Sequence, residues 1–295
     1  MRPYHPRMRI AVTGGSGKLG RAVVADLLAH DDEVLVLDVQ PPRDAGVVFI
    51  KVDVTDFGQA LGALTRVDDR HQGLDAVVHL AAIPGPGMRP DAALFANNII
   101  GTYNVFAAAR QAGIRNIVWA SSETVLGLPF DTPPPYLPVD EEVPLRPETS
   151  YSLGKDLEEE MARQFCRWDP ELKMIGLRFS NVMEPADYAA FPGFDADPAH
   201  RKWNLWSYID ARDGAQAVRR ALRHDATGMD VFIIANGDTV MARPTAELAA
   251  AVFPDVPIRR ALSGRETLLS IDKARRVLGY EPTHSWRDEG PAAED

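Results

Sequence analysis

The sequence contains almost no cysteine and no long apolar run. Cys166 is the only cysteine among 295 residues, so an intrachain disulfide is impossible and a reducing compartment, the cytoplasm, is expected. Cys166 itself is expected to be a small apolar residue on a helix. No stretch approaches the roughly 20 apolar residues that a membrane helix requires, and the apolar run near the amino terminus is too short for a signal peptide. We therefore expect neither secretion nor membrane insertion.

Positive charge and metal-binding patterns are also scarce. The formal net charge of −10 would repel phosphate backbones, and no basic stripe is interleaved with aromatic residues, so nucleic acid is not expected as a partner. The seven histidines are scattered, without H-x-x-H spacing and without a cysteine partner. No zinc site or other metal site is therefore predicted.

The sequence does contain a regular alternation of short β-branched runs and helical patterns. Apolar runs of strand length, typical of buried parallel strands, cover residues 8–13, 33–38, 47–53, 75–81, 116–121, 173–179 and 231–236. Helical patterns cover residues 18–29, 56–66, 91–112, 150–167, 244–253 and 270–278. This alternation predicts βαβ units, and therefore an α/β fold with a Rossmann-type, doubly wound parallel sheet.

The alternation is lost in residues 183–206, which are rich in proline, aspartate and aromatic residues. Because this segment shows no clear period, we expect it to cover a substrate rather than to join the sheet. The predicted organisation is a disordered leader at 1–7 and a Rossmann domain at 8–182 plus 207–237. A smaller, discontinuous carboxyl-terminal substrate-binding region would comprise 183–206 plus 238–295.

A glycine-rich loop, TGGSGKLG at residues 13–20, directly follows the first predicted strand and opens the first predicted helix. Gly14 and Gly17 permit a tight turn and a close backbone approach, and Gly20 lets the helix pack on the strand. The helix amino terminus offers unpaired N–H groups and a positive dipole end to a pyrophosphate. Asp38, at the end of the second predicted strand, can accept hydrogen bonds from an adenosine ribose and would repel a 2′-phosphate. The loop and Asp38 together predict NAD rather than NADP.

This loop allows two other interpretations. It resembles a P-loop only faintly, because Leu19 stands where that motif has serine or threonine and Val12 stands where it requires glycine. Hydrolysis of ATP or GTP is therefore not predicted. The second interpretation, in which the glycines serve only a tight turn, stays open.

A second chemical signal is YSLGK at residues 151–155. Tyr151 and Lys155 are four positions apart and should share one helix face. Such a spacing is common by chance, so its position in the chain matters. The helix follows the predicted strand 116–121, which leads into Ser122, and ligands of such folds bind at the carboxyl edge of the sheet. Ser122 and Tyr151 are therefore both expected near that edge.

Together these motifs resemble the extended short-chain dehydrogenase/reductase superfamily, in particular its NAD-dependent epimerase/dehydratase family. The resemblance covers nearly the whole chain, from Met8 to about Trp286. The matching segments, in order, are TGGSGKLG (13–20), VDVTD (52–56), HLAA (79–82), NIIGTYNV (98–105), SSETVLG (121–127), YSLGK (151–155), LRFSNV (177–182) and DKARRVLGYEP (272–282).

The resemblance implies a set of cofactor-binding residues. VDVTD would flank the adenine, HLAA would lie under the cofactor, and LRFSNV would lie beside the nicotinamide. The implied set is Gly14, Ser16, Gly17, Lys18, Leu19, Asp38, Asp53, Val54, Leu80, Ala81, Ala82, Asn98, Tyr151, Lys155 and Phe179.

The resemblance also implies a catalytic group of Ser122, Tyr151, Lys155 and Asn98. Tyr151 would take the hydroxyl proton while a hydride leaves a secondary alcohol. A free tyrosine has a pKa near 10, so a depression of about 3 units is needed near neutrality, and the Lys155 ammonium has the right sign to supply it. Lys155 would also hold the nicotinamide ribose, and Ser122 would bind the substrate oxygen. Asn98 would order the helix or a water behind Lys155.

The implied substrate contacts are Ser122, Glu123, Thr124, Asn181 and Arg212. The chain departs from the family pattern where Leu126 replaces a tyrosine and where Met183 and Glu184 replace tyrosine and glycine. Nucleotide-sugar enzymes of the family usually have a longer domain here, with arginines that bind the diphosphate, whereas residues 183–206 are short and acidic. A small sugar, a sugar acid and a nucleotide sugar therefore all stay open as substrates.

Glu123 bears on the type of reaction. Sugar-nucleotide dehydratases of the family carry Asp-Glu after the hydroxyl residue, whereas this chain has Glu123-Thr124. With one carboxylate gone, we expect an NAD-dependent oxidoreductase or epimerase. The alternatives are a dehydratase that uses Glu123 and a non-catalytic NAD(P)-binding sensor, although a sensor would need none of Ser122, Tyr151 and Lys155. Glu123 could also be only a solvated loop charge.

Two further expectations concern assembly and the second half of the chain. The helices at 91–112 and 150–167 resemble those that form a four-helix dimer interface in relatives, so a homodimer is expected. Asp213 is expected to cap the amino terminus of a helix that returns from the substrate region.

Overall fold

The computed structural model describes residues 6–43, 46–65 and 72–289. Within these ranges seven strands form one sheet in the order β3-β2-β1-β4-β5-β6-β9, and every neighbouring pair is parallel. The strands are β1 (Arg9–Thr13), β2 (Glu33–Asp38), β3 (Val48–Lys51), β4 (Ala76–His79), β5 (Asn116–Ser122), β6 (Lys173–Phe179) and β9 (Gly228–Ile234). The predicted doubly wound parallel sheet is confirmed. Most of the predicted leader, residues 1–5, lies outside the described residues.

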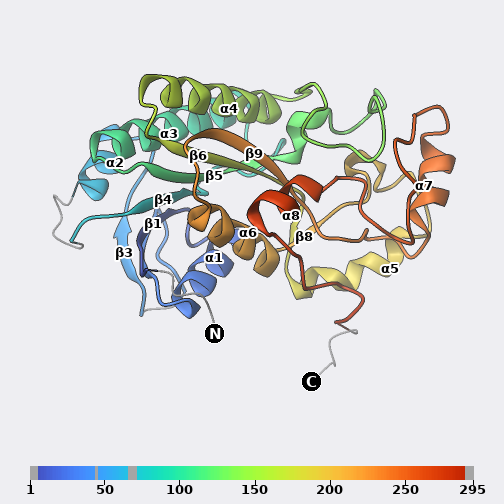
Figure 1. The fold of residues 1–295 in the computed structure, drawn as a ribbon, viewed down its shortest axis with the longest axis horizontal. Coiled ribbons are helices and arrows are strands. Elements are labelled where there is room, and N and C mark those ends of the chain that lie inside the picture. Colours follow the sequence, from blue (N-terminus) through green and yellow to red (C-terminus); the bar gives the residue numbers. More distant parts are fainter. Residues whose placement is uncertain (1–5, 44–45, 66–71, 290–295) are drawn as a thin grey trace.

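Helices cover both faces of the sheet (Figure 1). One face carries α2 (Phe57–Leu64), α3 (Asp91–Gln111) and α4 (Ser150–Trp168), and the other carries α1 (Lys18–Ala29) and α6 (Ala211–Arg223). The alternation of side chains along β2 shows why two cores form: Val34 and Val36 pack in the core under α1 and α6, whereas Leu35 and Leu37 pack in the core under α2 and α3. Strands buried on both faces account for the continuous apolar runs in the sequence.

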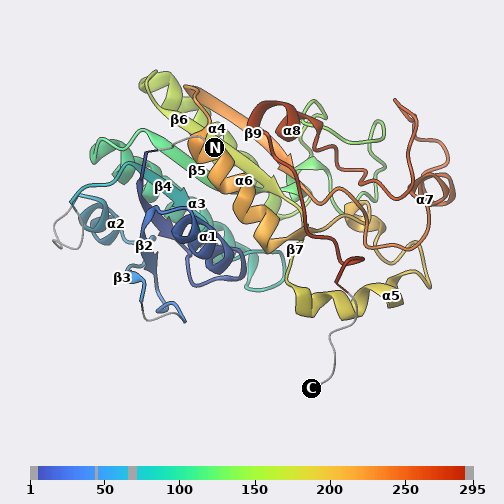
Figure 2. The same cartoon turned by 60° about the horizontal axis from the view of Figure 1, so that its bottom comes forward.

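After β6 the chain leaves the sheet and forms short elements beyond the carboxyl ends of the strands (Figure 2). These are β7 (Val182–Met183), the 3₁₀ helices at Pro185–Ala190 and Lys202–Asn204, α5 (Phe191–Phe194) and β8 (Ile209–Asp210), which pairs with β7. We call residues 183–206 the lid segment. Later come α7 (Thr245–Val252) and α8 (Asp272–Leu278). The division into two domains stays a prediction.

The prediction that Asp213 caps a helix is wrong. Helix α6 begins at Ala211, and Asp210 is its N-cap, with its carboxylate accepting a 2.8 Å hydrogen bond from the Arg212 N–H. The Asp213 carboxylate instead accepts hydrogen bonds from the N–H groups of Thr283 (3.0 Å) and His284 (2.8 Å). Asp213 therefore ties α6 to the chain that follows α8.

Some apolar side chains stay exposed on the two helices for which a dimer interface is expected. These are Ile100 and Tyr103 on α3, and Leu153 and Leu157 on α4. The homodimer stays a prediction. In the described part of the chain, no helix is both long and apolar enough to cross a membrane.

Gly176 in β6 offers a test of core packing. A Cβ at this position would lie 2.7 Å from the ring of Trp119, which is fully buried. We expect Gly176→Ala to lower the free energy of unfolding by about 1–3 kcal/mol, because an overpacked core must shift its side chains. Urea unfolding measures this. Gly62→Ala on α2 is the control, since no atom lies within 4 Å of its Cβ position, and equal stabilities of the two variants would contradict the prediction.

Candidate functional site

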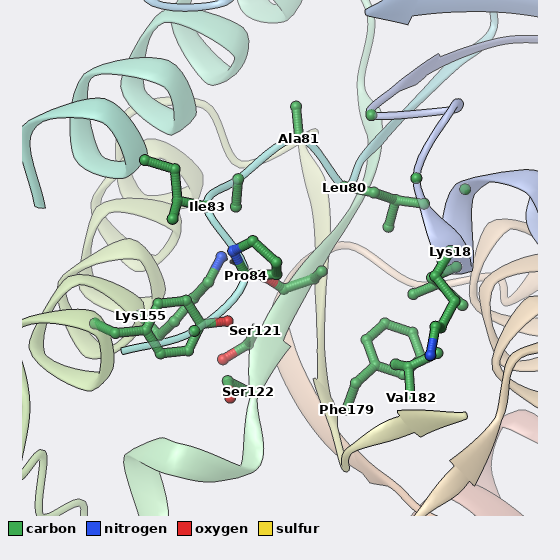
Figure 3. Close-up of a pocket in the computed structure, with 18 of the residues that line it drawn as sticks. Lys18, Leu80, Ala81, Ile83, Pro84, Ser121, Ser122, Lys155, Phe179 and Val182 are labelled. Carbon is green, nitrogen blue, oxygen red and sulfur yellow. Dashed lines mark hydrogen bonds between the residues drawn. The ribbon is translucent and has the colours of Figure 1, made fainter. Parts of the chain in front are cut away.

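A cavity of about 860 Å³ lies along the carboxyl ends of β1, β2, β3, β4, β5 and β6. Figure 3 shows Lys155, Ser121 and Ser122 on one side of it and Lys18, Phe179 and Val182 on the other. Of the residues predicted from the sequence, the cavity brings together Gly14, Ser16, Gly17, Lys18, Leu19, Asp38, Asp53, Val54, Leu80, Ala81, Ala82, Ser122, Glu123, Thr124, Tyr151, Lys155, Phe179 and Asn181. Asn98 and Arg212 do not line it.

The glycine loop lets three backbone segments meet without side chains between them. Gly14 has a φ of +69°, and a Cβ on it would lie 2.6 Å from the Ala81 nitrogen. A Cβ on Gly20 would lie 2.1 Å from the Gly14 carbonyl oxygen. The N-cap of α1 is Gly17, so no side chain caps this helix. Its first N–H groups are therefore available to a phosphate at the cavity.

The Asp38 carboxylate is oriented by two backbone donors at the rim of this cradle. It accepts hydrogen bonds from the N–H groups of Ser16 (3.0 Å) and Gln40 (3.1 Å). Next to it, the lid segment is tied to α1 by two partly exposed ion pairs, Lys18–Asp187 at 2.6 Å and Arg21–Glu184 at 2.7 Å. The Asp38 carboxylate thus lies at the end of β2, whereas Lys18 and Arg21 of α1 form ion pairs with the lid segment.

Tyr151 and Lys155 are placed by the start of α4. Thr149 caps this helix in a capping box with Ser152, which puts Tyr151 in its first turn. The pKa of Tyr151 is raised above its usual value, because the effect of burial outweighs the lowering by the Lys155 ammonium and by a hydrogen bond from Ser122. Lys155 alone therefore does not give the expected depression. The Lys155 Nζ lies 6.0 Å from the centre of the Tyr151 ring. Ser122, Tyr151 and Lys155 therefore form one group at the end of β5.

Asn98 lies near this group but bonds elsewhere. Its side chain accepts a 2.8 Å hydrogen bond from the Ile83 N–H and donates a 3.0 Å hydrogen bond to the Ile83 carbonyl. Ile83 lines the cavity. Asn98 therefore holds the loop after β4 in place, and its amide makes no bond to Lys155.

Glu123 is buried, so the interpretation as a solvated loop charge is wrong. Its side chain is 3% exposed, and burial raises its pKa to about 7, against the opposing influence of Ser180, Asn204 and Arg201. The Asn204 amide donates to Glu123 Oε1 at 3.3 Å. The bend at the end of β5 thus directs this carboxylate beneath the lid segment.

Four buried polar atoms around Glu123 have no hydrogen-bond partner among the described residues. They are Glu123 Oε2, Ser180 Oγ, Arg201 Nε and Asn204 Oδ1. We call these four residues the lid cluster. Glu123 and Ser180 line the cavity, so the lid cluster borders it. Buried polar groups without a partner are rare in proteins and commonly bind a water or a ligand.

Three members of the lid cluster were not among the predicted site residues. Ser180 follows β6, and Arg201 and Asn204 lie in the lid segment, where no periodic pattern exists to orient side chains. The available signal was an arginine isolated in an acidic, aromatic stretch. Arg212, which was predicted to bind substrate, forms ion pairs with Asp210 and Glu289, and the structure does not bring it to the cavity.

No group of three or more histidine, cysteine, aspartate or glutamate side chains that could hold a metal ion is found among the residues that the structure describes.

A model of the "NAD dependent epimerase/dehydratase family" matches residues 10–235. The chain belongs to this family. The predicted resemblance is thereby confirmed, and the family is NAD-dependent.

Individual relatives differ in how much of their length this chain spans. It is 32% identical to UDP-glucose 4-epimerase 2 of Oryza sativa subsp. japonica over 68% of this chain, but covers only 50% of that protein. It is 28% identical to the L-arabinose 1-dehydrogenase (NAD(P)(+)) of Haloferax volcanii over 93% of this chain and 96% of that protein. Among solved structures, a short-chain dehydrogenase/reductase superfamily protein from Agrobacterium tumefaciens with bound NAD is similar, with a TM-score of 0.72, 25% identity and coverage of 95% and 94%.

The raised pKa of Glu123 gives a test of its burial. The pKa rises from 4.5 to about 7, so the folded state holds this proton more tightly than the unfolded state, and stability falls as pH rises through this window. We expect Glu123→Gln to stabilise the protein by up to about 3 kcal/mol at pH 8 and by little at pH 5. Thermal unfolding at both pH values measures the difference. Glu142→Gln, at a side chain that is 85% exposed, is the control. A stability gain that is equal at pH 5 and pH 8 would rule out the assigned burial.

Proposed function

We propose that this chain is an NAD-dependent dehydrogenase that oxidises a hydroxyl-bearing carbon of a small sugar, with Tyr151 as the base. The supporting observation is that Ser122, Tyr151 and Lys155 line the same cavity as the glycine loop and Asp38. A sensor would need only the cofactor-binding half of this cavity. The presence of a hydroxyl, a phenol and an ammonium in the other half supports an enzyme.

The cradle fits the pyrophosphate of a dinucleotide, because a side chain at Gly14 or Gly20 would fill it and the N–H groups at the start of α1 are uncapped. Bound NAD⁺ would supply the hydride acceptor. The Asp38 carboxylate would accept hydrogen bonds from the adenosine ribose and repel a 2′-phosphate, which supports NAD over NADP.

Hydrogen-bond directions in the catalytic group support the proposed roles. Ser122 Oγ accepts hydrogen bonds from the Thr124 N–H (3.2 Å) and the Thr124 hydroxyl (3.0 Å), so its own proton is free to be donated toward Tyr151 or a substrate oxygen. Tyr151 would take the substrate proton, and the Lys155 ammonium would stabilise the phenolate beforehand. Ser122 would hold the substrate oxygen in reach of Tyr151.

The lid cluster supports a neutral sugar as the substrate. Of its unpartnered atoms, the acceptor on Glu123 and the hydroxyl on Ser180 belong to residues that line the cavity, and sugar hydroxyl groups can pair with both kinds. The Arg201 guanidinium lies 5.1 Å from the centre of the Phe194 ring and 4.8 Å from the centre of the Trp203 ring, and its charge interacts with the Glu123 carboxylate. Because Arg201 already has a carboxylate as its counter-ion, a sugar acid or a diphosphate is disfavoured as the substrate.

The similarity to a sugar dehydrogenase extends over nearly the whole of both chains and supports the same substrate class. A UDP-glucose 4-epimerase of Lactobacillus helveticus is matched as fully, over 94% of this chain and 93% of that protein, so coverage does not decide between the two activities. An epimerase is the second candidate, favoured by the 32% identity to the rice enzyme. The two activities differ in the fate of the cofactor. A dehydrogenase accumulates NADH, whereas an epimerase regenerates its oxidised cofactor.

Turnover of a sugar panel tests the proposal. We expect NADH to accumulate with a neutral aldose, and not with uronic acids or nucleotide sugars. Tyr151→Phe should reduce kcat by at least about 100-fold, since general base catalysis contributes that much, while the Kd for NAD⁺ stays within a few fold. Absorbance of NADH and calorimetric titration measure the two quantities. Full activity in Tyr151→Phe would exclude the assigned base, and inverted product without NADH would establish the epimerase.

The cofactor preference is tested at Asp38. Replacing it in Asp38→Ser removes both the acceptor for the ribose hydroxyls and the charge that repels a 2′-phosphate. We expect the ratio of kcat/KM for NADP⁺ to that for NAD⁺ to rise at least about tenfold, corresponding to roughly 1.4 kcal/mol of lost discrimination. An unchanged ratio would show that Asp38 does not select the cofactor.

A further inference from the structure

Glu158 is a buried carboxylate that directly contacts Lys155 and that no motif of the sequence indicates. Its side chain is fully buried, and its Oε2 accepts a 2.9 Å hydrogen bond from the Lys155 Nζ. Lys155 is itself only 3% exposed. An ion pair that is shielded from water on both sides acts on its neighbours far more strongly than a surface pair.

The hydrogen bonds of the Lys155 ammonium show what Glu158 does to its position. Of the three donors on this ammonium, one is given to the Ala120 carbonyl at 2.8 Å and one to Glu158. One donor is therefore left for the cavity. The acceptors of these two bonds lie on β5 and on α4. Because the two bonds together fix the orientation of the ammonium, Glu158 helps to set the direction of its third N–H.

A chain of buried hydrogen bonds runs from the floor of the cofactor cradle to Thr102, a neighbour of Glu158. Thr13 Oγ1 accepts from the N–H groups of Leu80 (3.2 Å) and Ala81 (3.3 Å), so its proton points to His79 Nδ1 at 2.7 Å. His79 Nε2 then carries the other proton and donates to Thr102 Oγ1 at 3.0 Å. Burial raises the pKa of the Glu158 carboxylate, while Lys155 and then the Thr102 hydroxyl favour its charged form.

The next glutamates on α4 have other partners. Glu159 accepts hydrogen bonds from Arg178 at 2.9 and 2.7 Å and from the Ser121 hydroxyl at 2.7 Å. Glu160 is half exposed and pairs with Arg163. Glu158 is therefore the glutamate of this acidic run that accepts a hydrogen bond from Lys155. Glu160 provides a matched control substitution on the same helix.

We propose that Glu158 is a positioning residue of the site: its carboxylate holds the Lys155 ammonium in place, and its charge sets the pH range in which Tyr151 and Lys155 work as a pair. This inference rests on the proposed roles of Tyr151 and Lys155. During each turnover Tyr151 changes its charge, so it cannot serve as a constant counter-ion. Glu158 supplies that counter-ion in both states.

The direction of the charge effect follows from the groups around the pair. Burial would lower the pKa of Lys155, but Glu158 opposes this and the pKa is raised. Burial also raises the pKa of Tyr151, and Glu158 raises it further. The other titratable or charged groups that face the pair are Glu159 on α4 with its partner Arg178 on β6, His79 on β4 and Glu123 after β5. Neutralising position 158 leaves these groups in place and makes both protons easier to remove.

The test compares Glu158→Gln, Glu158→Asp and Glu160→Gln with the wild type. Absorbance of tyrosinate in the free protein, with the matching Tyr151→Phe variant subtracted, reports the titration of Tyr151. We expect Glu158→Gln to lower its midpoint by about one pH unit. Glu158→Asp, which keeps the charge, and Glu160→Gln should stay within about 0.3 unit of the wild type. With a substrate, both limbs of the kcat/KM profile should move to lower pH in Glu158→Gln.

A role in packing alone would lower kcat at every pH without moving the midpoint, and that result overturns the inference. If Glu158→Gln does not fold, Lys155→Gln is compared with Lys155→Gln/Glu158→Gln, where two amides replace the ion pair. The double variant is then expected to titrate Tyr151 about one unit lower than the single variant, and equal midpoints overturn the inference. Because the free-protein titration needs no substrate, failure of the proposed dehydrogenase activity is seen separately in the sugar panel.

Discussion

The parallel register of the sheet is the constraint on which the site depends. Because neighbouring strands run in one direction, their carboxyl ends meet at one edge, and segments at the ends of six strands line a single cavity there. The cavity at this edge requires backbone segments to lie in direct contact with one another. A Cβ on Gly14 would collide with Ala81, and a Cβ on Gly20 would collide with the backbone of Gly14 and Gly15. The end of the cavity at Gly14 and Gly20 is thus shaped by missing side chains, and the end at Tyr151 and Lys155 by present ones.

Much of the fold could be predicted because burial on both faces leaves a plain record in the sequence. The alternation of apolar runs and helical patterns located the sheet strands within a few residues. The lid segment could not be predicted in the same way, since its helices are too short to show a period. The N-cap of α6 was predicted at the wrong residue for a related reason. Asp210 and Asp213 are both of a residue type that favours an N-cap, and the pairing of β8 with β7 decides between them.

The site could be predicted where local motifs carry the chemistry, and not where distant segments meet. Ser122, Tyr151 and Lys155 come together because each has a fixed place relative to β5 and α4. The burial of Glu123 depends on the lid segment, which lies far along the chain, so no local pattern reveals it. Glu158 was missed because a glutamate three positions after a lysine is usually a solvated surface pair. Only tertiary packing makes this pair a buried one.

The lid segment is held unevenly along its length. At its far end Trp206 is fully buried in the core, as is Phe191 within the segment. Near its start, the ion pairs Lys18–Asp187 and Arg21–Glu184 are partly exposed to water, and such pairs contribute about 0–1 kcal/mol each. The segment is thus held by buried apolar side chains in its middle and at its far end, and by weak ion pairs near its start. Because salt screens exposed ion pairs but not apolar contacts, the attachment of its start depends on ionic strength and that of its far end does not.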